Sequence, residues 1–286
     1  MINMKTGRII KNVSNQYTID TGAETIVALP RGNMRKGHIP VVGDLVEFES
    51  FGKTNRIHRI LPRKNRLLRP AVANVDQALI VTSLYDPDFS DHLLNRLIFL
   101  VCLEDVEPVL CITKCDLSKD KEYEEKLAPY EKAGYTIVYS YPGSNDDALK
   151  ELLAGKISVL CGQSGAGKSS LLNRLDPHFQ LQTQAISKAL GRGKHTTRHC
   201  ALYPIADGWV VDTPGFSSLN LQLINTDDLD KKIKDFVPYI GHCRFKDCKH
   251  LKEPDCAVKL AVETGEINPT IYEDYRQIKE ELWKIR

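Results

Sequence analysis

The sequence predicts a chain of three domains: a small β-barrel of the OB type, a central α/β domain and a helical C-terminal domain. Three observations lead to this prediction. Five short strand-like runs separated by Gly, Asn and Pro turns occupy the first seventy residues. A glycine-rich loop lies between a strand-like and a helical run near the middle of the chain, and three cysteines and a histidine cluster near its end. We expect the domains to span residues 1–68, 69–221 and 222–286. Helical runs are expected at Ser90–Leu103 and Lys121–Ala133 in the second domain, and at Asp227–Phe236 and Ile271–Ile285 in the third.

The barrel prediction depends on short runs rich in β-branched and aromatic residues, each bounded by turn-forming residues. Barrels of this type commonly bind oligonucleotides on one face. The first domain is therefore expected to be an RNA-binding OB fold. Its predicted strands are Gly7–Val13, Gln16–Asp20, Glu24–Pro30, Asp44–Phe48 and Arg56–Leu61.

Positive charge is concentrated where the predicted barrel ends. The segment Phe51–Val75 contains no acidic residue, although the whole chain has a formal net charge of only +2. Such a concentration is typical of a nucleic-acid footprint, and the alternative is a solvated strand edge and linker. Asp176–Asp207 is likewise free of acidic residues between its ends, so this segment is a second candidate for phosphate contact. The basic residues of the first segment are Lys53, Arg56, Arg59, Arg63, Lys64, Arg66 and Arg69.

The glycine-rich loop fits the pattern G-x-x-x-x-G-K-[ST], which binds nucleotide phosphates. Its glycines let successive backbone N–H groups point at phosphate, Lys168 supplies a positive charge, and the Ser169 hydroxyl reaches magnesium. The run Lys156–Cys161 before it predicts a strand, and Ser169–Leu175 after it predicts a helix. The expected phosphate contacts are Gly162, Gln163, Ser164, Gly165, Ala166, Gly167, Lys168, Ser169 and Ser170.

A second motif, Thr113–Asp116, follows the apolar run Glu107–Thr113 and is expected to read the nucleotide base. Open α/β sheets bind ligands at the carboxyl ends of their strands. A carboxylate at Asp116 accepts two hydrogen bonds from the ring and amino N–H groups of guanine, whereas adenine offers no such pair. The commoner first residue of this motif is Asn, which Thr113 replaces. The expected base-side residues are Thr113, Lys114, Asp116 and Ser140, the last at the end of the strand-like run Tyr135–Tyr141.

A third element, Asp212–Gly215, follows the apolar run Trp209–Val211 and fits the pattern D-x-x-G. In that pattern the Asp holds magnesium through water and the Gly N–H senses the γ-phosphate. The glycine-rich segment Gly191–Arg198 has the composition of a mobile switch. Either Thr196 or Thr197 is expected to offer a hydroxyl to magnesium, and the pattern does not decide between them. As the working assignment, we take Ser169 and Thr197 as the magnesium ligands.

The residue after Asp212–Gly215 is Phe216, where Ras-type GTPases place a Gln that orients the attacking water. A phenyl ring cannot hydrogen-bond to water. His195 in the switch segment is the nearest polar candidate for orienting or deprotonating that water, with His199 as a rival. We therefore expect His195 and Lys168 to be the catalytic residues.

The C-terminal cluster has the pattern Cys-x4-Cys-x-His-x5-Cys. Three thiolates and one imidazole suit a tetrahedral structural zinc ion. Disulfide pairing is the alternative, and we disfavour it because Met1–Ile10 lacks an apolar signal-peptide core and a P-loop protein belongs in a reducing compartment. The other five cysteines are expected to be packed thiols. The expected zinc ligands are Cys243, Cys248, His250 and Cys256.

Apolar runs in the chain are short. Leu97–Leu103 spans seven residues, far fewer than the ~18 that a membrane-spanning helix needs. We therefore expect a cytoplasmic protein with no membrane association.

The order of the motifs is the reverse of the usual one, because Thr113–Asp116 precedes Gly162–Ser169. With the barrel before these motifs and the Cys/His cluster after them, nearly the whole chain resembles the circularly permuted bacterial GTPases called ribosome small subunit-dependent GTPase A. The resemblance implies hydrolysis of GTP to GDP and phosphate, stimulation by the 30S ribosomal subunit, and a role in late small-subunit assembly through contacts with 16S rRNA. It also implies a switch-loop His important for hydrolysis, which corresponds to His195, and a hydrophobic residue at Phe216. We expect a monomer.

Two other functions are compatible with parts of the pattern. One is a P-loop ATPase or kinase that acts on a small molecule, which Asp116 argues against. The other is an RNA-binding scaffold in which the nucleotide is only structural. A basic barrel and a zinc module do not distinguish a scaffold from a ribosome-activated enzyme.

Overall fold

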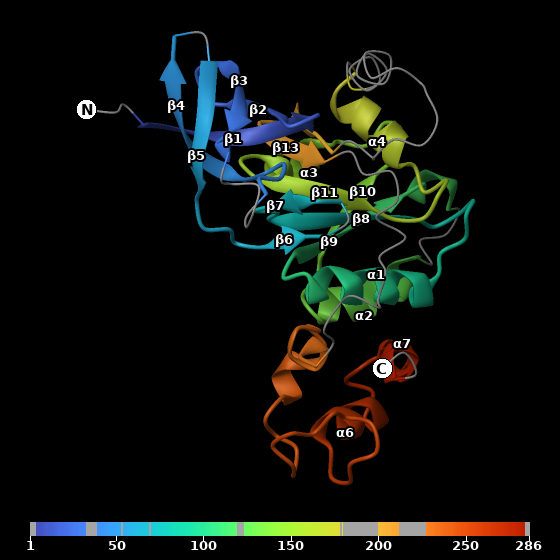
Figure 1. Cartoon of the computed structure of the whole chain (residues 1–286). Coiled ribbons are helices and arrows are strands. Elements are labelled where there is room, and N and C mark those ends of the chain that lie inside the picture. The colour runs from blue at the N-terminus through green and yellow to red at the C-terminus, as the bar shows by residue number, and fades with distance from the viewer. Residues whose placement is uncertain are drawn as a thin grey trace. The chain divides into compact units, whose positions relative to one another are not determined.

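The computed structural model describes residues 4–32, 39–52, 54–68, 70–118, 123–177, 179, 200–211 and 227–283. Figure 1 labels the helices and strands along the chain. Two compact units are present, and each combines segments that are far apart in the sequence. The first unit comprises Met1–Gln77, Asp146–Leu160 and Ser169–Phe216, and the second comprises Ala78–Asn145, Cys161–Lys168 and Ser217–Arg286. The boundaries expected at residues 68 and 221 stay a prediction.

The first unit contains the predicted barrel. Its five strands close in the order β1-β2-β3-β5-β4, in which β3 and β5 are parallel and the other neighbours are antiparallel. Ser14 and Asn15 both have positive φ, as the tight β1–β2 hairpin requires. Alternate residues such as Ile9, Ile19 and Ile57 are fully buried in the barrel. The strands are β1 Met4–Val13, β2 Gln16–Asp20, β3 Thr25–Pro30, β4 Leu45–Phe51 and β5 Thr54–Ile60.

The rest of the first unit surrounds a buried strand, β11, which runs parallel to β13. Strand β12 pairs antiparallel with β13. The predicted strands at Lys156–Cys161 and Trp209–Val211 and the helix at Ser169–Leu175 are confirmed as β11, β13 and α4. The short ribbon β6–β7, helix α3 and strand β12 were not predicted. The elements are β6 Arg66–Leu67, β7 Val72–Ala73, α3 Asp147–Leu153, β11 Ile157–Cys161, α4 Lys168–Leu175, β12 Leu202–Ile205 and β13 Gly208–Val211.

The second unit is built on three strands in the order β10-β9-β8, and β10 runs parallel to β9. Every residue of β8 is buried, as is typical of a strand covered on both faces. The Ser90 hydroxyl accepts the Leu93 N–H and so caps helix α1, which begins where the sequence predicts a helix. The elements are β8 Gln77–Ser83, α1 Asp91–Leu103, β9 Glu107–Thr113, the short 3-10 turn η2 Cys115–Leu117, α2 Tyr123–Lys132 and β10 Thr136–Ser140.

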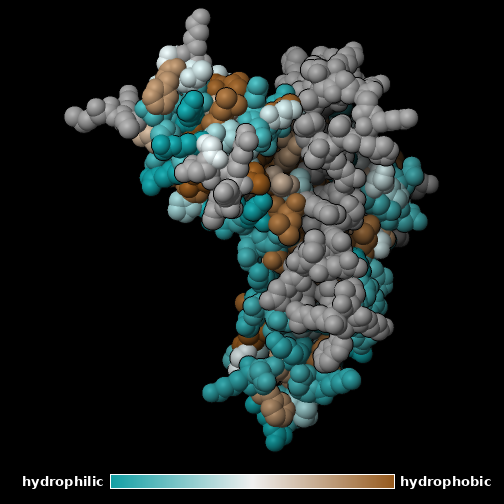
Figure 2. Space-filling view, in the orientation of Figure 1, coloured by the Kyte–Doolittle hydropathy of each residue, from teal (hydrophilic) through white to brown (hydrophobic). Residues whose placement is uncertain are grey.

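The C-terminal part of the second unit contains helices α6 Ala257–Glu263 and α7 Pro269–Trp283. Helix α7 is held to α1 by the buried Asp274 carboxylate, which lies 2.6 Å from His92 Nδ1 and accepts the Asn95 Nδ2 amide at 2.7 Å. On the face shown in Figure 2 this part of the surface is mostly hydrophilic. Among the described residues, no helix combines the length and apolarity that crossing a membrane would require.

The prediction of a helix over Asp227–Phe236 is wrong. This segment forms the 3-10 turn η5 Leu229–Lys231 and further turns, followed by η6 Val237–Tyr239. Leu229, Ile233 and Phe236 are buried at helical spacing, which explains the prediction. Backbone bonds that span three residues, such as Lys232 N–H to Leu229 O and Phe236 N–H to Ile233 O, alternate with single bonds that span four, such as Ile233 N–H to Leu229 O, so no continuous α-helix forms.

Candidate functional site

The predicted phosphate-binding loop connects β11 to α4 and has a backbone that only glycine tolerates well. Gly162, Gly165 and Gly167 have φ of +133°, +84° and +91°. A Cβ atom at Gly162 would lie 2.0 Å from the Val81 carbonyl oxygen on β8. Close approach to a buried strand therefore requires glycine at position 162.

Lys168 points back into this loop. Its Nζ donates to the carbonyl oxygens of Gly162 at 2.7 Å and of Gln163 at 2.6 Å. Burial lowers the pKa of Lys168, because desolvation disfavours the charged amine. Ser169 and Ser170 follow in the exposed first turn of α4, where free N–H groups favour anions. The local arrangement has the backbone and the cation that phosphate binding requires.

Thr113 joins the second motif to this loop. Its buried hydroxyl donates to the carbonyl oxygen of Ala166 at 2.7 Å and also lies 3.3 Å from that of Thr82. The sequence places Thr113 among the residues that contact the base. In the structure its side chain ties the end of β9 to the phosphate-binding loop. Contact of Thr113 with a base stays a prediction.

The remaining base-side candidates lie at the same end of the strands. Lys114 adopts left-handed backbone geometry at the start of η2, and the Asp116 side chain in this turn is exposed. Ser140 is buried at the end of β10, directly opposite Thr113 in the register. The structure therefore brings Thr113, Lys114, Asp116 and Ser140 to one edge, beside the loop that Thr113 contacts.

The segment Leu84–Ser90 lies beside both motifs, and the sequence did not indicate this position. The Lys114 ammonium donates to the Asp86 carbonyl oxygen, and Pro87 Cδ would lie 3.3 Å from a Cβ atom at Gly165. The Ser83 hydroxyl holds the segment by donating to the Pro87 carbonyl oxygen at 2.7 Å. This segment thus contacts both motifs. Its only signal in the sequence is the Asp-Pro pair, which indicates a turn without indicating a partner.

Several expected site residues lie outside the part of the chain that the structure describes. They are His195, Thr196, Thr197, Asp212 and Gly215, together with Phe216 and the rival His199. Their assignments stay predictions.

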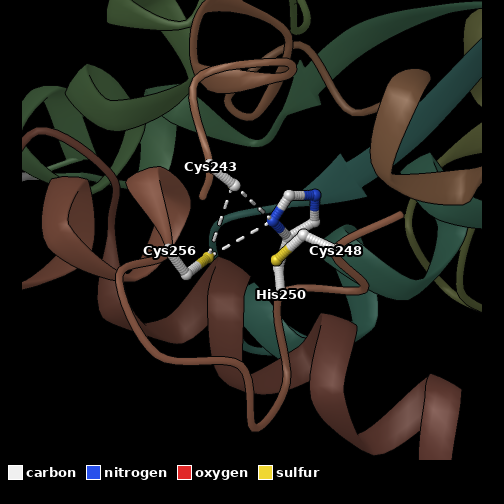
Figure 3. A group of neighbouring side chains, drawn as sticks. All are labelled: Cys243, Cys248, His250 and Cys256. Atoms are coloured by element: carbon white, nitrogen blue, oxygen red, sulfur yellow. Dashed lines mark hydrogen bonds between the residues drawn. The ribbon is translucent and has the colours of Figure 1, made fainter. Parts of the chain in front are cut away.

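The Cys/His cluster is assembled as predicted (Figure 3). His250 Nδ1 lies 3.5 Å from Cys243 Sγ and 3.3 Å from Cys256 Sγ, and the two sulfur atoms are 3.9 Å apart. All four ligand atoms, including that of Cys248, lie within 4.8 Å of one another. Zinc bonds of about 2.3 Å to sulfur and 2.0 Å to nitrogen give tetrahedral edges of about 3.8 Å between two sulfur atoms and about 3.5 Å between sulfur and nitrogen. The donor set and its spacing therefore fit a zinc ion.

The disulfide alternative is not realised, because all eight cysteines are free. Burial opposes ionisation of Cys243, but hydrogen bonds from the Ala257 amide and the neighbouring thiols lower its pKa overall. A thiol that is easily deprotonated is a ready metal ligand. Outside the cluster, burial raises the pKa of Cys102 to about 12 and that of Cys115 to about 11, as expected for packed thiols.

The loop that carries His250 is preformed by its neighbours. The Glu253 carboxylate accepts the N–H groups of Lys249, Leu251 and Lys252, and these bonds lower its pKa although burial opposes the shift. The Tyr272 hydroxyl on α7 donates to the His250 carbonyl oxygen at 2.8 Å. These contacts hold the backbone on either side of His250.

Comparisons with known proteins cover nearly the whole chain. Residues 6–56 match the RsgA N-terminal domain family, and residues 60–222 match the RsgA GTPase family. The chain is 44% identical over 285 residues to the small ribosomal subunit biogenesis GTPase RsgA 2 of Listeria innocua serovar 6a, covering 98% of each chain. A relative in Shouchella clausii, named small ribosomal subunit biogenesis GTPase RsgA, is also 44% identical, over 286 residues and 98% of each chain.

Solved structures agree with these relatives. The crystal structure of YloQ, described as a circularly permuted GTPase, has a TM-score of 0.84 and 36% identity, covering 99% of this chain and 96% of YloQ. YjeQ from Thermotoga maritima has a TM-score of 0.85 and 34% identity, covering 99% of this chain and all of YjeQ. The resemblance drawn from the motif order is therefore confirmed, and the chain belongs to the RsgA GTPase family.

Proposed function

We propose that this chain binds GTP between the loop Gly162–Ser170 and the motif Thr113–Asp116, and hydrolyses it to GDP and phosphate during late assembly of the small ribosomal subunit. The observation that carries the proposal is the hydrogen bond from the Thr113 hydroxyl to the Ala166 carbonyl oxygen. This bond joins the proposed base-reading motif to the proposed phosphate-binding loop, which lies 53 residues later in the chain. The names of the relatives from Listeria and Shouchella supply the process.

On the phosphate side, the loop N–H groups, Lys168 and the first turn of α4 would bind the β- and γ-phosphates. Ser169 and Thr197 would hold magnesium, with Thr196 as the alternative to Thr197. Asp212 would contact the ion through water, and the Gly215 N–H would sense the γ-phosphate. Bound magnesium would neutralise the charge that develops on the phosphates.

On the base side, the exposed Asp116 carboxylate would accept two hydrogen bonds from guanine. Lys114 and Ser140 would complete the base contacts from neighbouring strand ends. The segment around Asp86 and Pro87 would position Lys114 and the loop relative to each other, because it contacts both.

For hydrolysis, we assign His195 as the residue that orients the attacking water, since Phe216 cannot. Stimulation by the 30S subunit would then come from ordering the segment Gly191–Thr197 over the phosphates. This mechanism also predicts that GTP hydrolysis is slow in the absence of the 30S subunit.

The 30S contact would involve 16S rRNA and the barrel of residues 1–68. Three of the basic residues there are already paired with carboxylates: Arg59 with Glu47, Arg63 with the buried Asp44, and Lys64 with Asp76. Arg56 and Arg66 are exposed and are the better candidates for phosphate contact among the described residues.

The proposed GTPase domain, residues 69–221, is followed by a C-terminal domain of residues 222–286. A zinc ion held by Cys243, Cys248, His250 and Cys256 would stabilise this C-terminal domain. A monomer acting in the cytoplasm fits a role on the ribosomal particle.

The decisive experiment is GTP hydrolysis by the purified chain alone and with 30S, 50S and 70S particles, with ATP as the control nucleotide. We expect strong stimulation by 30S alone. Equal turnover of ATP, or no stimulation by any particle, would overturn the proposal. Asp116→Asn tests the base assignment, because it should weaken GTP binding and favour xanthosine triphosphate, whose 2-oxo group matches an amide donor.

A further inference from the structure

The imidazole of His250 has a buried carboxylate on the side that faces away from the sulfur atoms. Its Nδ1 faces Cys243 and Cys256, whereas its Nε2 lies 3.5 Å from Asp230 Oδ2. The two side chains are 3% and 5% exposed. Asp230 belongs to the 3-10 turn η5, far from the ligand loop in sequence.

This carboxylate lacks a full set of partners. Among the described residues, its Oδ1 atom is buried without a hydrogen-bond partner. A buried anion of this kind is costly unless it is paired, and an apolar residue in its place would cost less. The Oδ2 atom lies 3.5 Å from Nε2, at the long limit of a hydrogen bond, and the broad χ2 torsion of Asp allows a closer approach.

We propose that Asp230 is the outer-shell partner of the metal centre: it accepts the Nε2–H of His250, fixes the tautomer that presents the Nδ1 lone pair to zinc, and thereby anchors the turn Leu229–Lys231 to the metal. The inference depends on the zinc site proposed above. Carboxylates that accept the free N–H of a ligating histidine raise its basicity and fix its ring.

The anchored turn is part of a small core that needs such support. Leu229 and Phe236 are fully buried, and the Phe236 ring packs on Tyr275 at 5.0 Å and on His250 at 6.4 Å between centroids. These rings connect the turn, the ligand loop and α7. Fixing Asp230 on His250 would therefore hold together the three segments of this core.

A different role for Asp230 would be to balance the charge of Lys279. Burial lowers the pKa of Lys279, and the Asp230 carboxylate opposes that shift. The two roles differ in one respect: only the first depends on an imidazole at position 250.

The test measures zinc affinity by competition with a chromophoric chelator in the full-length chain. Asp230→Asn and Asp230→Ala are expected to weaken zinc binding by about 10- to 100-fold. The control Asp228→Asn removes an exposed carboxylate paired with Lys231 on the same turn and should leave the affinity unchanged. The absorption spectrum of the cobalt-substituted protein should still indicate three sulfur ligands and one nitrogen ligand.

Two further measurements separate the possible failures. In a His250→Cys background, Asp230→Ala should no longer affect zinc affinity; an undiminished effect would mean that Asp230 acts through Lys279 or packing, and would overturn the inference. Wild-type affinity in Asp230→Ala would overturn it as well. Cys243→Ala must abolish tight binding, and if it does not, the zinc site itself is wrong.

Hydrogen exchange provides a readout of the anchoring. The amides of Lys232, Ile233 and Phe236 donate within the turn segment. They should exchange faster in zinc-loaded Asp230→Asn than in the zinc-loaded wild type. Equal exchange rates would refute the anchoring of the turn.

Discussion

Replacing Thr113 by Val is the most direct perturbation of the proposed nucleotide site. The two side chains have nearly the same shape, so the change removes the hydroxyl that donates to the Ala166 carbonyl oxygen without leaving a cavity. Both residues are buried, and water cannot easily replace the lost donor. Leaving a buried acceptor unpaired costs about 1–3 kcal/mol.

The lost hydrogen bond can lower the free energy of unfolding, the affinity for nucleotide, or both. If the whole cost falls on the nucleotide-bound state, the Kd for GDP and GTP rises roughly 5- to 150-fold, since about 1.4 kcal/mol corresponds to a factor of ten. Titration with a fluorescent guanine nucleotide measures the affinity, and denaturant unfolding measures the stability. Thr113→Ser keeps the hydroxyl and should stay close to the wild type. If Thr113→Val changes neither quantity, the hydrogen bond does not hold the site together.

Three other outcomes are expected. Gly162→Ala should fail to bind nucleotide or destabilise the fold, because its methyl group would meet the Val81 carbonyl oxygen; wild-type titration and unfolding curves would contradict this. Burial raises the pKa of Asp235 from 3.8 to about 6. As the pH rises between these values, the unfolded chain loses this proton while the folded chain keeps it, so the free energy of unfolding falls. The advantage of Asp235→Asn over the wild type in unfolding free energy should therefore grow between pH 4 and 7, by up to about 3 kcal/mol, and a constant difference would refute the shift. His195→Ala should abolish 30S-stimulated turnover while leaving GTP affinity intact, and unchanged stimulated turnover would exclude His195 from catalysis.

Local patterns in the sequence were sufficient for most of the fold. The barrel strands follow from alternation and turn residues, and Ser90 marks the start of α1 as a cap. Elements as short as Arg66–Leu67 carry too few residues for a pattern. Over Asp227–Phe236, in contrast, the sequence predicts a helix that does not form, because buried residues at helical spacing can also come from successive turns.

The candidate sites divide in the same way. The proposed phosphate loop and zinc ligands each lie in one short stretch of chain, so a single sequence can indicate them. The contacts of Thr113 with Ala166, of Lys114 with Asp86 and of His250 with Asp230 join residues that are distant in the chain. Such pairs are set by tertiary packing, and a single sequence contains no signal for them.

The bond between Thr113 and Ala166 also has a consequence for the order of synthesis. In this chain the base-reading motif leaves the ribosome first, and the phosphate loop follows 53 residues later. At roughly 5–20 residues per second, the Thr113 hydroxyl waits for its partner for roughly 3–10 s. If the proposed function holds, a nascent chain therefore has no complete nucleotide site until its phosphate-binding loop has also emerged.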